Sequence, residues 1–184
     1  MERFTRASAW LFGSLLVALS LFIAVETAVR KLAGVSMQGA DELGGYVLAI
    51  GGALSFTVAL VERAHVRIDF VYVRLPPLAR ALLDLLSVLS LAALGLFFAR
   101  YGWLVVRDTL AYGSTAPTAW ATPMILPQSL WYAALLVFAA ASLWSAARAV
   151  RWLVSGRREA LARALAPRAL AEELDEELAD VARR

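Results

Sequence analysis

The 184-residue sequence contains no cysteine and a single histidine. The absence of cysteine excludes disulfides, thiolate metal sites and cysteine nucleophiles. With only one histidine as well, a zinc or haem site is hard to assemble within this chain. No G-x-S-x-G, H-E-x-x-H or Walker A motif is present. We therefore expect neither a cofactor in this chain nor an enzymatic activity, although His65 with Glu62 and Asp69 leaves one acid–base set to consider.

Polar sequence is also scarce. Hydrophobic residues make up 61% of the chain, and its mean hydropathy is +0.67, whereas a soluble domain carries about 45–50% apolar residues. We therefore expect lipid to be the solvent for most of the chain. The net charge of +3 comes almost entirely from arginine, because Lys31 is the only lysine. No soluble basic face exists to bind nucleic acid, and such an excess is typical of cytoplasmic loops.

Four long apolar segments alternate with polar connections. The second segment, Leu43–Val61, has no charge over 19 residues, and a hydrocarbon core of ~30 Å needs roughly 20 residues of helix. The sequence predicts an all-α integral membrane protein, with a membrane domain at 1–156 and helices at about 9–29, 43–61, 78–106 and 129–154. The first segment is interpreted as a retained helix rather than a cleaved signal peptide. Residues 157–184 are predicted to form an amphipathic helical tail.

The connection after the second helix is densely charged. Charges recur at every second or third position from Glu62 to Asp69. An isolated strand at a membrane surface would have no ladder partner, so the segment is interpreted as a short surface helix. Pro76 and Pro77 then suit the first turn of the third helix.

The distribution of basic residues predicts the orientation. The N-terminal segment, the second connection and the exit from the fourth helix carry ten Lys and Arg residues, against three in the other two connections. The positive-inside rule therefore places both termini and the tail in the cytoplasm. Asp41 and Glu42 then face outside, and Arg63, His65 and Asp69 face the cytoplasm.

A stripe of small residues runs along the second helix. Gly45, Ala49, Ala53 and Thr57 are four apart and share one helix face. Small residues at this spacing let helices approach closely in lipid, where apolar burial alone does not drive association. The stripe indicates packing against helices of this or another chain. The alternative is the ordinary enrichment of glycine and alanine in membrane helices.

One group of residues resembles a known family. It comprises Glu42, Tyr46, the turn Arg63-Ala64-His65 with Asp69, and the pairs Leu75-Pro76 and Leu126-Pro127. This pattern resembles the small membrane subunit of tripartite ATP-independent periplasmic (TRAP) transporters, the DctQ-like family, over roughly Trp10 to Leu153. The sequence departs from the family pattern at Gln128-Ser129.

The resemblance implies a small accessory subunit of a sodium-coupled importer of organic acids in the bacterial inner membrane. Its partners would be a large membrane subunit, which holds the sodium and substrate sites, a periplasmic substrate-binding protein, and membrane lipids. The substrate cannot be read from this chain. The expected partner-binding residues are Gly45, Ala49, Ala53, Asp41, Glu42, Arg63, His65 and Asp69. The alternative is a stand-alone small multidrug-type exporter that works as a homodimer through Glu26.

Overall fold

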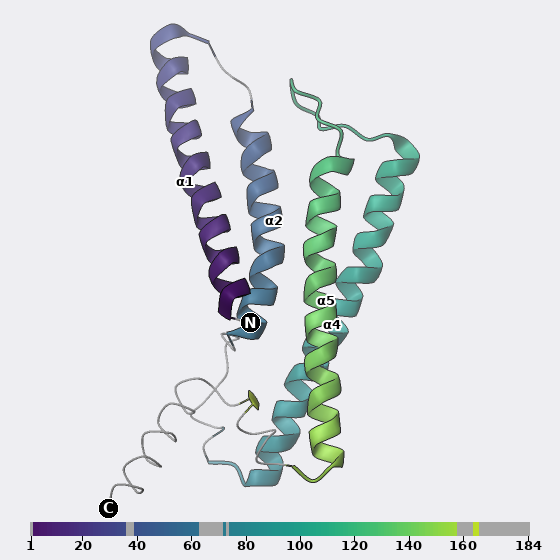
Figure 1. Cartoon of the computed structure of the whole chain (residues 1–184). Helices are drawn as coiled ribbons and strands as arrows, with labels where there is room; N and C mark the ends of the chain where they lie inside the picture. The colour runs from purple at the N-terminus through teal and green to yellow at the C-terminus, as the bar shows by residue number, and fades with distance from the viewer. Residues whose placement is uncertain (1, 36–38, 63–71, 73, 158–163, 166–184) are drawn as a thin grey trace, which may run out of the picture. The chain divides into compact units, whose positions relative to one another are not determined.

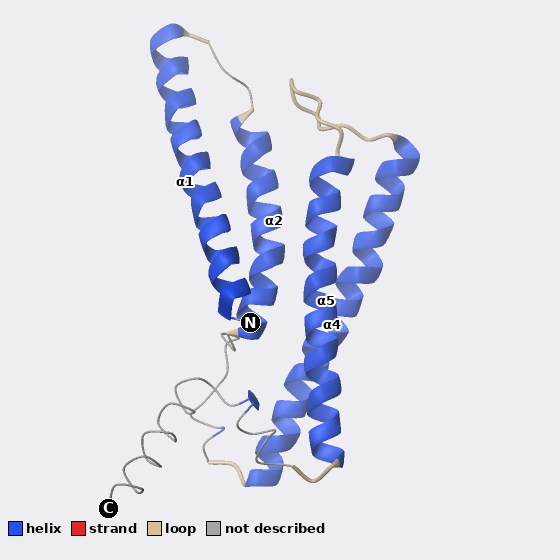
Figure 2. Ribbon diagram, viewed as in Figure 1, coloured by secondary structure: helices blue, strands red, loops and turns tan. Residues whose placement is uncertain are grey.

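The computed structural model describes residues 2–35, 39–62, 72, 74–157 and 164–165. These residues include four α-helices, which are α1 (Glu2–Ala33), α2 (Ala40–Val61), α4 (Pro77–Tyr112) and α5 (Ile125–Val154) (Figure 1). The residues between α4 and α5 form a loop, and no strand occurs in the described ranges (Figure 2). The predicted all-helical class is therefore confirmed. Residues 63–71 and 73 of the connection in which a short surface helix is predicted lie outside the described residues, and the sidedness of the termini stays a prediction.

All four helices are long and apolar enough to cross a membrane. The 22 residues of α2 give a length of ~33 Å at 1.5 Å per residue, which matches a hydrocarbon core of ~30 Å. The 36 residues of α4 give ~54 Å. Because α4 is longer than the core is thick, it must tilt or extend into the interface.

The helices are longer than the sequence indicated. α4 runs to Tyr112 rather than to about residue 106, and α5 begins at Ile125 rather than at about 129. Gly113 ends α4 with a φ of 58°, a left-handed conformation that glycine adopts at helix ends. Pro127 lies within the first turn of α5, where the missing N–H would have no helical partner anyway. The prolines of this connection therefore leave both helix ends intact.

The chain divides into two compact units. The first comprises Met1–Val58 and Phe97–Phe138. Its core contains the buried residues Ala53, Ala134 and Leu135, packed against Phe98 and Trp131 among others. Phe56 of α2 contacts the rings of Phe98 and Phe138, each at a centroid distance of 5.6 Å. This unit therefore joins α2 to the second half of α4 and the first half of α5.

The second unit comprises Ala59–Leu96 and Ala139–Arg184. Ala81, Val88 and Ala149 form its buried core, and Leu165 of the predicted tail packs against this cluster. The carboxylate of Asp84 is almost fully buried and accepts a hydrogen bond of 2.7 Å from the Tyr72 hydroxyl. The rest of the predicted tail lies outside the described residues, apart from Arg157 and Ala164.

Candidate functional site

The main polar cluster of the first unit is centred on Glu42, in the first turn of α2. The Glu42 side chain is only 6% exposed. The Tyr46 hydroxyl, one turn along the helix, donates to Glu42 Oε1 at 2.9 Å. The Thr118 hydroxyl donates to the other carboxylate oxygen. A buried carboxylate needs such donors, and its position at a helix N-terminus is electrostatically favourable.

Thr118 belongs to a narrow hairpin that connects α4 to α5. The Ala116 amide donates to the Thr122 carbonyl at 2.9 Å, and the Met124 amide donates to the Ser114 carbonyl at 3.0 Å. Thr115 and Pro123 form an antiparallel bridge between these two bonds. Residues 113–124, called the connecting hairpin below, therefore have an internal ladder. The bond from Thr118 to Glu42 ties this hairpin to the start of α2.

A second contact ties the same two segments. An ideal Cβ built on Gly39 would lie 2.2 Å from a carbon of the Trp120 ring. The indole therefore occupies the space that any larger residue at position 39 would need. Trp120 thus packs against Gly39 of its own chain, and 47% of the residue is still exposed. Glu42 and Gly39 together hold the connecting hairpin at one end of the first unit.

The helices on either side of the hairpin are also joined. The Thr109 hydroxyl donates to the side-chain oxygen of Gln128 at 2.5 Å. Thr109 is in the last turn of α4 and Gln128 is in the first turn of α5. The departure from the family pattern at Gln128 thus has a structural role, because it closes the base of the hairpin.

The small-residue stripe of α2 divides into two parts. Ala53 and Thr57 are buried in the first unit. Gly45 and Ala49 are exposed, and an ideal Cβ on Gly45 would meet nothing within 4 Å. The stripe predicted as one packing face therefore packs inside the chain at one end and is open at the other.

Other glycines of the chain show what an occupied position looks like. An ideal Cβ built on Gly51 would lie 1.6 Å from the Phe12 ring. One built on Gly95 would lie 2.9 Å from the Ala139 Cα, and one built on Gly102 would lie 2.9 Å from the Tyr132 ring. Gly44 and Gly52, like Gly45, have nothing within 4 Å. The chain thus uses some of its helical glycines for its own close contacts and leaves three on α2 uncovered.

The remaining predicted site residues are placed as follows. Asp41 is exposed beside the buried Glu42. Arg63, His65 and Asp69 lie outside the described residues. Glu26, on which the exporter alternative depends, is 6% exposed and lies in α1. No group of three or more His, Cys, Asp or Glu that could hold a metal ion occurs among the residues that the structure describes.

Sequence reasoning found part of this cluster. The spacing of Glu42 and Tyr46 is the i, i+4 spacing of neighbours on a helix, so that contact could have been inferred. Thr118 is 76 residues from Glu42, and no periodicity links the two positions. Nothing in the sequence pairs Trp120 with Gly39 either, because the two positions are 81 residues apart.

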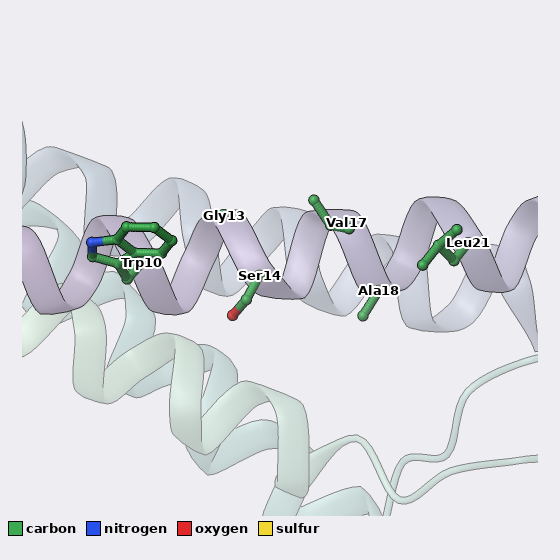
Figure 3. Close-up of a pocket in the computed structure, with 6 residues that line it drawn as sticks. All are labelled: Trp10, Gly13, Ser14, Val17, Ala18 and Leu21. Atoms are coloured by element: carbon green, nitrogen blue, oxygen red, sulfur yellow. The ribbon is translucent and has the colours of Figure 1, made fainter.

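α1 carries an open apolar groove of about 670 Å³. Figure 3 shows the residues that line it, which recur at three- and four-residue intervals along one helix: Trp10, Gly13, Ser14, Val17, Ala18 and Leu21. Its composition suits contact with acyl chains or an apolar helix, and it offers no set of polar groups that would bind a solute.

Four helices that are long and apolar enough to cross a membrane define the class of this protein as an integral membrane protein. The sequence matches the family model described as "Tripartite ATP-independent periplasmic transporters, DctQ component" over residues 17–154. The chain therefore belongs to the DctQ family of TRAP transporter small membrane subunits, as the resemblance predicted. No curated protein and no solved structure gives a significant match.

This membership carries several conclusions. Members of this family are proteins of the bacterial inner membrane. They are components of a transporter and not enzymes. It works in a tripartite transporter together with a large membrane subunit and a substrate-binding protein. The predicted class of function, location and main protein partners are therefore confirmed at this level.

Proposed function

We propose that this chain braces the large membrane subunit of a sodium-coupled importer of organic acids and helps to dock the periplasmic substrate-binding protein. Family membership supports the assembly. The sodium and substrate sites are assigned to the large subunit, because the apolar helices described here offer few polar ligands. The single observation that carries the bracing role is the uncovered glycine face of α2.

That face is continuous along the helix. Asp41, Gly45, Leu48, Gly52 and Ser55 follow one another at intervals of three or four residues, so they share one side of α2. Leu48 is 61% exposed, and the two glycines have empty space beside them. We call these five residues the open face of α2.

The open face needs a physical reason. A glycine inside a helix costs about 0.8–1 kcal/mol relative to alanine, and at Gly45 and Gly52 no contact within the described chain offsets that cost. Close approach of a helix from another chain would offset it, because small residues let backbones meet in lipid. The occupant proposed here is a helix of the large membrane subunit.

The test is co-purification of tagged chain and large subunit from membranes in a mild detergent. Gly45→Leu should lower the recovered ratio of large to small subunit by about tenfold, equivalent to ~1.4 kcal/mol, by holding the helices apart. Ala140→Leu is the matched control, because it places the same leucine side chain at an exposed position of α5. An unchanged ratio for Gly45→Leu would remove the open face as the contact.

The docking role is proposed for the connecting hairpin and Asp41. Glu42 was expected to share this role, but its buried carboxylate is already bound by Tyr46 and Thr118. We therefore assign Glu42 the role of holding the hairpin, and Asp41 that of meeting the partner. Pro117, Ala119 and Pro123 are exposed on the hairpin, which rests against the start of α2, where Asp41 also lies.

Docking can be measured as binding of the purified substrate-binding protein to the membrane complex in nanodiscs. Asp41→Asn should slow association and weaken its dependence on salt, because an exposed charge mainly affects the encounter rate. The control is Asp108→Asn, an exposed acid that is already paired with Arg107 at 2.9 Å. Docking with identical rate and salt dependence in Asp41→Asn would contradict the assignment.

A further inference from the structure

An exposed arginine lies within the apolar surface of α4. Arg100 is exposed and is flanked in sequence by Phe97, Tyr101 and Trp103, each roughly half-exposed. Within the described part of the chain, the Arg100 side chain takes part in no hydrogen bond, ion pair or ring contact. Two other arginines differ: Arg107 pairs with Asp108, and Arg148 lies over the Trp152 ring.

The depth of Arg100 follows from the helix itself. It precedes Arg107, which is exposed and ion-paired, by seven residues, or ~10 Å at 1.5 Å per residue. A long arginine side chain can extend along the helix and carry its guanidinium toward the interface. An ionisable side chain at this depth is costly unless it finds a partner, and the described chain supplies none.

Aromatic rings mark the level that the guanidinium would reach. Phe97 and Tyr101 pack at a centroid distance of 4.5 Å, and Trp103 packs on Tyr132 of α5 at 6.2 Å. On a helix, Trp103 and Phe97 lie on opposite sides of Arg100, three residues away in each direction. Tyr and Trp are enriched at the headgroup level of membranes, where lipid phosphates lie.

We propose that Arg100 is a binding site for the phosphate of a phospholipid, in the leaflet on the side of the connecting hairpin. The planar guanidinium can donate two parallel N–H bonds to a phosphate, and the flanking rings contact the glycerol region and the upper acyl chains. The site binds one headgroup phosphate and does not depend on the large subunit.

The test is native mass spectrometry of the purified, delipidated chain titrated with phosphatidylglycerol. The wild-type chain should retain one lipid more tightly than the rest, and Arg100→Gln should weaken that first binding step by about tenfold or more. Arg107→Gln is the matched control, because it removes an exposed arginine of the same helix that is already paired. Inorganic phosphate is titrated in parallel to distinguish a lipid from a free anion.

Each outcome decides the question. Arg100→Lys keeps the charge but loses the bidentate fork, so it should bind with intermediate strength and covers the case in which Arg100→Gln does not fold. Equal lipid retention in wild type, Arg100→Gln and Arg100→Lys overturns the proposal. So does competition by millimolar inorganic phosphate, which indicates a free-anion site. Unchanged lipid retention in Arg100→Gln, together with loss of the large subunit when the two chains are co-purified, also overturns the proposal and identifies a partner carboxylate as the ligand.

Discussion

Two glycine substitutions of equal size should have opposite effects on stability. At Gly95 an added Cβ would lie 2.6 Å from the Ser142 hydroxyl oxygen and 2.9 Å from the Ala139 Cα. The serine side chain can rotate, but the Cα is backbone, so α4 and α5 must separate locally. At Gly52 the added Cβ would meet nothing within 4 Å. Gly95→Ala should therefore destabilise the chain, and Gly52→Ala should not.

The magnitudes follow from two terms. Replacing a helical glycine by alanine contributes about 0.8–1 kcal/mol through helix propensity. Forcing an extra methyl group into a packed contact costs about 1–3 kcal/mol. Gly52→Ala gains the first term alone and should be up to ~1 kcal/mol more stable. At Gly95 one neighbour is the Ala139 Cα, which is backbone and cannot move aside, so the upper part of that packing range, about 2–3 kcal/mol, applies. After subtraction of the propensity gain, the net loss should be about 1–2 kcal/mol.

The assay is reversible unfolding of the isolated chain in mixed micelles, followed by circular dichroism as denaturing detergent is added. The same pair of variants is then co-expressed with the large subunit. There Gly52→Ala should lose its advantage, because the new methyl group meets the partner helix. Gly95→Ala as stable as wild type would refute the close contact of α4 and α5. Gly52→Ala that loses stability in the isolated chain would refute the claim that this face is open.

Two further predictions concern the connecting hairpin. Glu42→Leu and Thr118→Val should each speed hydrogen exchange at the Ala116 and Met124 amides, which are bonded inside the hairpin, by about tenfold. The double variant should exchange no faster than Glu42→Leu alone, because Thr118 donates to the Glu42 carboxylate that this change already removes. Additive effects would show that the two side chains act separately. Gly39→Ala should displace the Trp120 ring, which lies 2.2 Å from the added Cβ, at a modest cost because the ring is half-exposed and can move. The measurement is the NMR spectrum of protein labelled with fluorotryptophan, in which Trp120→Phe assigns the Trp120 resonance. That resonance should shift in Gly39→Ala and stay in place in the control Gly13→Ala, where the added Cβ meets nothing within 4 Å. An unchanged Trp120 resonance in Gly39→Ala would contradict the contact.

Much of the fold could be predicted because membrane helices depend on local sequence. An apolar run of about 20 residues can satisfy its backbone in lipid only as a helix, so the existence of each spanning helix was secure. The positions at which the helices begin and end were harder to predict. The predicted helix bounds left residues 107–128 as the connection, yet Pro127 is accommodated in the first turn of α5. Only the three-dimensional hairpin between Gly113 and Met124 shows where the irregular part begins and ends.

The candidate site was harder to predict, because its contacts join distant positions. The charge pattern identified Asp41 and Glu42 as a pair of outer acids and gave them one role. The structure separates them, since Glu42 is buried and Asp41 is exposed. Two neighbouring residues in the first turn of a helix point about 100° apart, so one can face a loop of the same chain while the other faces away. The sequence could not say which, because the deciding residue, Thr118, is remote.

The distinction between occupied and open glycines links this structure to assembly. Close contacts within the chain occur where a ring or backbone already fills the position beside the glycine, as Phe12 does at Gly51. Such a glycine is explained by the stability of the chain alone. The stability of the chain does not explain Gly45 and Gly52, because alanine at either position would stabilise an isolated helix. They also lie on the same helix as Glu42, which fixes the connecting hairpin. α2 therefore offers an open face for a neighbouring helix along its length and a tethered hairpin at its start, so a single rigid element can brace one partner and position the surface that meets another.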